Sequence, residues 1–204
     1  MGCIQAFDVE QIVEKTGVKT FIETGTLHGE GVEYAKAFPF EQIHSIEIIS
    51  NLAESAKHKF ADDHRIKIHQ GHSADVLEEL LPKIDTSILF WLDAHFPGAD
   101  SKHSTAGGEN VYDRRVPLES EIKIISQRVD KFKDVLVIDD LWLYEDGPFE
   151  TGLFNDWMKI HHNGETRQDL CGSDASFIEA AFKDTHDIQK FYKQQGYIVC
   201  TPKN

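Results

Sequence analysis

The stretch Phe21-Ile22-Glu23-Thr24-Gly25-Thr26-Leu27-His28-Gly29-Glu30-Gly31 decides the fold of this chain. Its apolar start is typical of a buried strand, and the residues from Gly29 onward are typical of the start of a helix. Gly25 and Gly29 remove side chains where a ligand could approach the backbone, and a helix beginning here offers free N–H groups. The stretch therefore predicts a strand–turn–helix ligand site with the acidic Glu23 where the strand ends.

Strands and helices alternate on both sides of this turn. The hydrophobic periodicity predicts strands at 20–23, 42–46, 66–69, 87–92, 134–138 and 197–200. It predicts helices at 8–15, 29–38, 51–60, 74–81, 118–125, 149–160 and 187–194. This alternation is typical of an α/β protein with a doubly wound, mostly parallel, Rossmann-like sheet flanked by helices. We expect seven strands with an antiparallel last strand, in a single domain spanning residues 1–204.

Composition narrows the class of partner. The formal net charge is −14, with 35 acidic against 21 basic residues, which argues against a nucleic-acid backbone or an anionic membrane surface. No apolar run is long enough to span a bilayer, and the N-terminus lacks the pattern of a secretory signal. The three cysteines are widely spaced, as in a cytoplasmic protein with reduced thiols. We therefore expect a cytoplasmic protein that acts on a small molecule, and its oligomeric state stays open.

Polar residues follow the predicted strands at one edge of the sheet. Because ligands of doubly wound sheets bind outside the carboxyl ends of the strands, these residues are candidates for one site. An acidic residue roughly 20 positions beyond a glycine-bearing turn is where such folds hold the hydroxyls of a ribose, and Glu47 stands there. The polar strand ends are Glu23, Glu47, His72-Ser73, Asp93-Ala94-His95 and Asp139-Asp140.

In this order, these motifs resemble those of class I S-adenosylmethionine-dependent methyltransferases. Residues 23–29 resemble the first motif of that family, Ser45-Ile46-Glu47 the second, and Gly71-His72-Ser73 the stretch after the third strand. The strand ends at 92–95 and 137–140 resemble those of small metal-dependent O-methyltransferases, including the macrocin type that acts on sugars. The resemblance covers roughly residues 20–142.

The resemblance implies S-adenosylmethionine as the cofactor. Glu23, Gly25 and Gly29 would pack against its amino-acid end, Glu47 would hold its ribose, and His72 and Ser73 would lie near its adenine. The complete implied set of cofactor-binding residues is Glu23, Thr24, Gly25, Thr26, Gly29, Glu47, His72, Ser73 and Asp93.

The resemblance also implies that Asp93, Asp139 and Asp140 are metal ligands. The chemistry agrees, because crowded carboxylates repel one another and oxygen ligands favour Mg²⁺, Mn²⁺ or Ca²⁺; we expect Mg²⁺. A bound cation would acidify an acceptor hydroxyl. His95, whose reference pKa lies near neutral pH, would then take the proton, so His95 and Asp93 are the predicted catalytic residues. Alternatively, the two adjacent aspartates could only stabilise the turn, and His95 could only anchor the following loop.

The leading prediction is therefore O-methylation of a small hydroxylated metabolite such as a sugar. The loop 96–115 and the residues after Glu145 would shape the acceptor pocket, with Trp142 and Tyr144 as lining candidates. One alternative is a transferase that uses nucleotide-sugars, although Glu23 would repel a diphosphate and the sequence lacks a G-x-x-x-x-G-K-[ST] loop. Another is a non-catalytic protein that binds the cofactor on the same fold.

Overall fold

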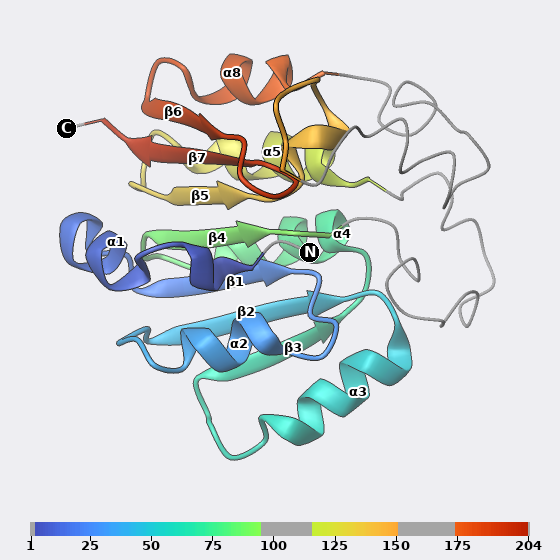
Figure 1. Ribbon diagram of the computed structural model, residues 1–204. Helices are drawn as coiled ribbons and strands as arrows, with labels where there is room; N and C mark the ends of the chain where they lie inside the picture. The colour runs from blue at the N-terminus through green and yellow to red at the C-terminus, as the bar shows by residue number, and fades with distance from the viewer. Residues whose placement is uncertain (1–2, 95–115, 151–173, 204) are drawn as a thin grey trace.

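The computed structural model describes residues 3–94, 116–150 and 174–203. Within these ranges, helices cover both faces of one seven-stranded sheet (Figure 1). Its strands are β1 (Thr20–Thr24), β2 (Gln42–Glu47), β3 (Ile66–Gln70), β4 (Ile88–Leu92), β5 (Val135–Ile138), β6 (His186–Phe191) and β7 (Tyr197–Pro202). The α-helices are α1 (Val9–Thr16), α2 (Glu30–Ala35), α3 (Ser50–Lys59), α4 (Ser73–Leu80), α5 (Leu118–Ile125) and α8 (Ser176–Phe182). Short 3₁₀ helices are η1 (Ile4–Ala6), η2 (Leu81–Lys83), η4 (Ser126–Arg128) and η5 (Leu141–Leu143).

The strand order is β3-β2-β1-β4-β5-β7-β6. The pairs β2–β3, β1–β2, β1–β4 and β4–β5 are parallel, and β7 is antiparallel to both of its neighbours. This confirms the expected Rossmann-like sheet, including its seven strands and antiparallel last strand. Since β1 and β4 are neighbours without being consecutive, the strand order reverses between them, and this switch point is where doubly wound folds bind ligands.

Two hydrophobic cores lie on the two faces of the sheet. In β1, Phe21 belongs to one core and Ile22 to the other, as the alternation of side chains along a strand requires. Helices α1, α2 and α3 pack in the first core, and α4, α5 and α8 pack in the second. The central strand β4 is buried along its whole length, which explains its continuous run of apolar residues.

The predicted element boundaries agree with the structure over most of the described chain. For example, α1 begins at the N-cap residue Asp8, whose side chain accepts a hydrogen bond from the Gln11 N–H at 2.9 Å, and ends at Gly17 with φ +70°. Among the described helices, none combines the length and apolar character that a bilayer-spanning helix requires.

The prediction of a helix at 187–194 is wrong, because β6 occupies this segment. Ile188, Phe191 and Tyr192 have helical spacing, but the backbone instead pairs with β7, from His186 opposite Pro202 to Phe191 opposite Tyr197. The helix α8 just before it has no counterpart in the prediction. The predicted helix at 149–160 lies outside the described residues, apart from its first two positions, which are not helical.

Candidate ligand site at the carboxyl ends of the strands

The glycine-bearing turn after β1 packs tightly against its neighbours. Gly25 has φ +90°, and a Cβ atom there would lie 2.8 Å from the Asp93 carbonyl oxygen. Gly29 has φ +79°, and a Cβ there would lie 2.7 Å from the Phe60 ring. Both positions therefore require glycine, for conformation and for space. The turn is held against the end of β4, so the backbones of the first and fourth predicted motifs are in contact.

Glu23 lies in β1, just before this turn, and its hydrogen bonds stabilise the turn. Its side chain is buried, and the Ser45 hydroxyl donates a hydrogen bond to its Oε2 at 2.6 Å. The Thr26 and Ser45 hydroxyls also lie 2.6 Å apart, so Glu23, Ser45 and Thr26 form a chain of hydrogen bonds. Burial raises the pKa of Glu23 to about 8, against the lowering effect of Ser45, and Asp93, Glu30 and Glu47 raise it further.

Glu47, at the end of β2, fixes the same turn from the other side. Its Oε2 accepts a hydrogen bond from the Leu27 N–H at 2.9 Å, and its Oε1 accepts one from the Ile49 N–H at 2.9 Å. Leu27 has φ +47°, which is uncommon for a residue with a side chain, and the bond to Glu47 stabilises that conformation. Each carboxylate oxygen keeps a second acceptor position, so Glu47 can still receive hydrogen bonds from a diol.

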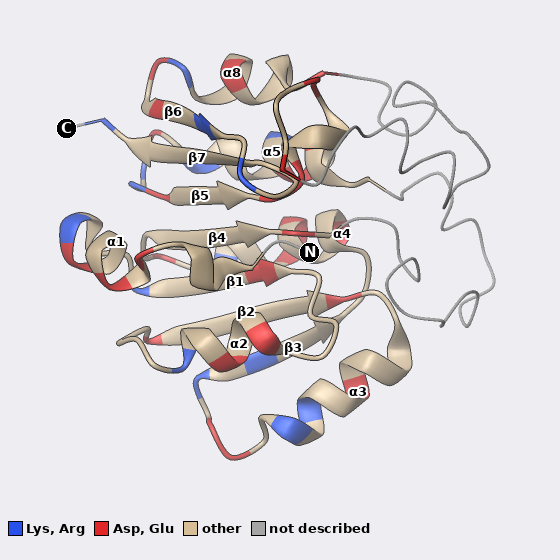
Figure 2. Cartoon of the chain, in the orientation of Figure 1, with Lys and Arg blue, Asp and Glu red and all other residues tan. Residues whose placement is uncertain are grey.

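Asp93, Asp139 and Asp140 come together at the ends of β4 and β5, and we call them the acidic triad. One carboxylate oxygen from each lies within 4.8 Å of the others. Two backbone contacts fix the arrangement, since the Asp139 N–H donates to the Leu92 carbonyl at 3.0 Å and the Asp140 N–H donates to Asp139 Oδ1 at 2.8 Å. Asp140 adopts φ +58°, and both it and Asp139 are buried. Figure 2 shows that acidic residues mark the ends of several strands at this edge.

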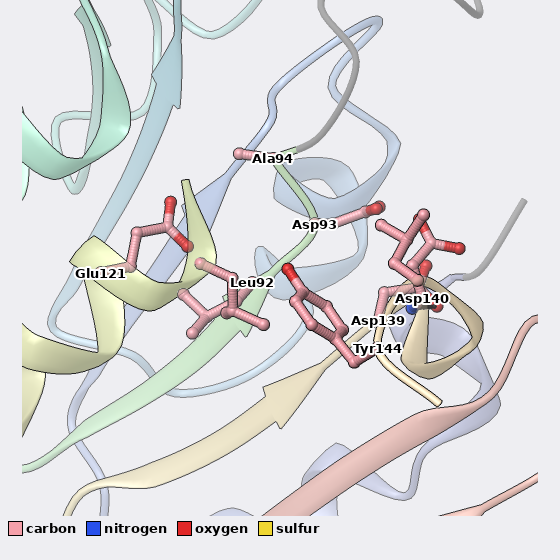
Figure 3. Close-up of a pocket in the computed structure, with 9 residues that line it drawn as sticks. Leu92, Asp93, Ala94, Glu121, Asp139, Asp140 and Tyr144 are labelled. Atoms are coloured by element: carbon pink, nitrogen blue, oxygen red, sulfur yellow. Dashed lines mark hydrogen bonds between the residues drawn. The ribbon is translucent and has the colours of Figure 1, made fainter. Parts of the chain in front are cut away.

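A pocket opens beside the acidic triad. Figure 3 shows the triad on one side and Glu121 on the other, with the Tyr144 ring between them. Tyr144 lines this pocket and Trp142 does not, while both pack in the same hydrophobic core; their predicted contact with an acceptor stays a prediction. The lining residues are Leu92, Asp93, Ala94, Leu118, Glu121, Asp139, Asp140, Leu143 and Tyr144.

Glu121 is a pocket residue that sequence reasoning missed. It lies on α5 with only 1% of its surface exposed, and its Oε1 has no hydrogen-bond partner. Burial raises its pKa to about 7, the nearby Ser73 and Thr24 hydroxyls lower it, and Asp93 raises it. A signal was available, because Leu118, Glu121, Ile122 and Ile125 form one buried helical face in which Glu121 is the single polar residue.

Of the remaining predicted residues, the structure describes Thr24, His72 and Ser73 but not His95. Thr24, at the end of β1, accepts a hydrogen bond from the Asp93 N–H through its Oγ1 at 3.3 Å. His72 occupies the N-cap position of α4, and Ser73 is the first residue of that helix and is buried. His95 and the loop 96–115 lie outside the described residues, so the predicted catalytic base stays a prediction.

Comparisons with known proteins support the fold. No model of a protein family matches the sequence, and no curated protein matches it either. Among solved structures, a candidate caffeoyl-CoA O-methyltransferase from Staphylococcus aureus is similar over 100% of this chain and 85% of its own, with TM-score 0.63 and 12% identity. An O-methyltransferase from Bacillus cereus in complex with SAH is similar over 100% of this chain and 82% of its own, with TM-score 0.54 and 11% identity. At these identities the likeness shows the fold of class I methyltransferases.

Proposed function

We propose that this protein is an S-adenosylmethionine-dependent O-methyltransferase acting on a small hydroxylated molecule such as a sugar. The observation that carries the proposal is the contact between the glycine-bearing turn and the acidic triad. The Gly25 backbone lies against the Asp93 backbone, so one end of a ligand bound at the turn would lie beside the triad. A methyl donor on the turn and a hydroxyl acceptor at the triad would then be neighbours, which is the positioning that group transfer needs.

The residues on the turn suit a methyl donor better than a diphosphate. Glu47 accepts the Leu27 N–H of this turn and retains acceptor positions for ribose hydroxyls. Several acidic groups surround this turn, which favours the cationic sulfonium and ammonium groups of S-adenosylmethionine over phosphates. The complex of the Bacillus cereus structure with SAH supports the same ligand class.

The acidic triad suits a divalent cation such as Mg²⁺. Three carboxylate oxygens within 4.8 Å of one another form a donor set for a hard cation, and two of the three residues are buried, where like charges repel strongly. When bound, such a cation supplies positive charge that makes an acceptor hydroxyl more acidic. Asp93 would orient that hydroxyl toward the turn, and we propose that His95 accepts its proton. The Tyr144 ring and Leu143 offer apolar surface for the acceptor.

A binding measurement tests the proposal first. S-adenosylmethionine and S-adenosylhomocysteine should raise the melting temperature of the protein, whereas nucleoside diphosphate-sugars and dinucleotides should not. The absence of a shift at saturating methyl donor would refute the function, and a shift with a nucleotide-sugar would favour the alternative transferase.

A turnover measurement then separates an enzyme from a binding protein. Radiolabelled methyl transfer from S-adenosylmethionine to a panel of diols and sugars should require Mg²⁺ and should stop on chelation. The variant Asp139→Asn, Asp140→Asn should retain methyl-donor binding and lose this activity. Asp62→Asn, which changes an exposed aspartate between α3 and β3, is the matched control. Binding without any transfer would indicate a non-catalytic protein.

A further inference from the structure

Glu121 differs from the other buried acids whose contacts are described. Asp134 accepts hydrogen bonds from the Ile88 N–H and from the Arg128 Nε, and both oxygens of Glu47 accept backbone N–H groups. A buried carboxyl that serves only the fold is normally satisfied in this way, because an unpaired buried acceptor is destabilising. Glu121 is equally buried, yet its Oε1 has no partner. This oxygen therefore has an unused acceptor position beside the pocket.

The position of Glu121 indicates which ligand it faces. It lines the pocket on the side opposite the acidic triad and is not a member of it (Figure 3). Ser73 at the start of α4 and Thr24 at the end of β1 lie near its carboxyl group. The buried Ser73 Oγ also lacks a hydrogen-bond partner. The Ser73 hydroxyl is thus near enough to lower the pKa of Glu121, yet no hydrogen bond of ordinary geometry joins it to Glu121 Oε1. Both atoms lie where β1 and the start of α4 would flank the methyl donor.

We propose that Glu121 is a recognition residue for the methyl donor and accepts a hydrogen bond from one of its amino groups. This inference rests on the proposed function. With Glu47 placed to receive the ribose hydroxyls, the N–H groups left on the donor are the exocyclic amino group of adenine and the α-ammonium group. Both offer the chemistry that a buried carboxyl oxygen needs, and Ser73 Oγ would complete the contact with the same group or its neighbour.

Ligands that each lack one amino group test the inference. The affinities of wild type, Glu121→Leu and Glu121→Gln would be measured by calorimetry for three ligands: S-adenosylhomocysteine, S-inosylhomocysteine, which lacks the adenine amino group, and the analogue that lacks the α-amino group. We expect wild type to prefer S-adenosylhomocysteine over one of the two analogues by on the order of 10- to 100-fold. In Glu121→Leu this preference should disappear, which identifies the amino group that Glu121 binds.

Controls separate recognition from folding. Glu121→Leu should melt at the same temperature as unliganded wild type or higher, because it removes an unpaired buried carboxyl. Glu121→Gln keeps the shape and one acceptor oxygen, so it should retain part of the preference even if the leucine variant folds poorly. Glu119→Leu, on the exposed face of the same helix, should behave as wild type.

The failure of the inference is distinguishable from the failure of the function. If wild type binds S-adenosylhomocysteine but the Glu121 variants show unchanged preferences, or weaken all three ligands equally, Glu121 is not a recognition residue. If wild type binds none of the three ligands, the proposed function is wrong and the inference falls with it.

Discussion

The strand β5 has buried aspartates at both of its ends, and the two ends are built differently. Before the strand, Asp134 pairs with Arg128, whose Nε lies 2.9 Å from Asp134 Oδ2. The same guanidinium donates to the carbonyl oxygens of Leu81, Ile84 and Thr86. It therefore connects η4, the residue before β5 and the segment 81–86. After the strand, Asp139 and Asp140 instead face a third carboxylate, Asp93.

Under the proposed function, the amino end of β5 serves stability and its carboxyl end serves ligand binding. At the amino end, every described group of the ion pair has a partner inside the protein, so the network belongs to the fold. At the carboxyl end, like charges are gathered and a buried carboxyl oxygen of Glu121 lacks a partner. Under the proposed function, a cation bound at the triad would offset the repulsion between these charges, which is the usual trade between stability and function at binding sites.

The largest effect is expected from a substitution that breaks the ion pair between Arg128 and Asp134 at the amino end of β5. Arg128→Met leaves Asp134 buried without its cation, and we expect the free energy of unfolding to fall by about 3–5 kcal/mol. Urea denaturation measures this change. Lys131→Met, at an exposed position nearby, is the control and should change stability little. A loss as small as that of the control would mean that the ion pair contributes no more than a surface pair.

The second prediction concerns metal at the carboxyl end. Adding Mg²⁺ or Mn²⁺ to metal-free wild type should stabilise the fold, by about 2.7 kcal/mol at one hundred times the dissociation constant. Thermal unfolding with and without chelator measures the gain. The gain should vanish in Asp139→Asn, Asp140→Asn and persist in Asp62→Asn. An equal gain in all three proteins would place the metal elsewhere.

The third prediction concerns the negative charges of Asp139 and Asp140 in the absence of metal. In chelator, Asp139→Asn, Asp140→Asn should be more stable than wild type by about 1 kcal/mol, because repulsion with Asp93 is relieved. Asparagine keeps the carbonyl oxygen that accepts the Asp140 N–H. Urea denaturation at low ionic strength checks the sign. A loss of stability would show that these aspartates serve the fold, as Asp134 does.

The fourth prediction is a pH dependence of stability that arises from Glu23. Its pKa is raised from 4.5 in the unfolded chain to about 8 in the fold, so the folded state keeps a proton that the unfolded state loses. Its contribution is complete below pH 4.5 and is lost as the pH rises through 8, with a slope of at most about 1.4 kcal/mol per pH unit. Glu23→Gln should flatten this slope, and Glu14→Gln, at an exposed site, should not. Identical slopes in both variants would contradict the prediction.

The sequence predicted the parts of the molecule that depend on local pattern. The turn at Gly25, the boundaries of α5 and the gathering of Asp93, Asp139 and Asp140 all follow from strand and helix periodicity and from the rule that parallel strands end at one edge. What failed depends on tertiary contacts. The segment 187–194 has helical spacing, but pairing with β7 decides its conformation.

The same distinction applies to details of the site. The role of Glu23 toward the cofactor stays a prediction, and its contacts with Ser45 and with the start of α2 are ones that only the neighbouring β2 and α2 reveal. Glu121 was overlooked because a single glutamate in a helix is ordinary until the face on which it lies is known to be buried.

The packing of Gly31 against Glu23 has a consequence for the ancestry of this chain. A Cβ atom at position 31 would collide with Glu23 Oε1, so any larger residue at position 31 requires the Glu23 carboxyl group to move away from its present place. The two positions are therefore coupled in space. In relatives of this protein, we expect a larger residue at the position of Gly31 to occur more often together with a shorter residue at the position of Glu23, and this covariation would trace the turn through sequences of low identity.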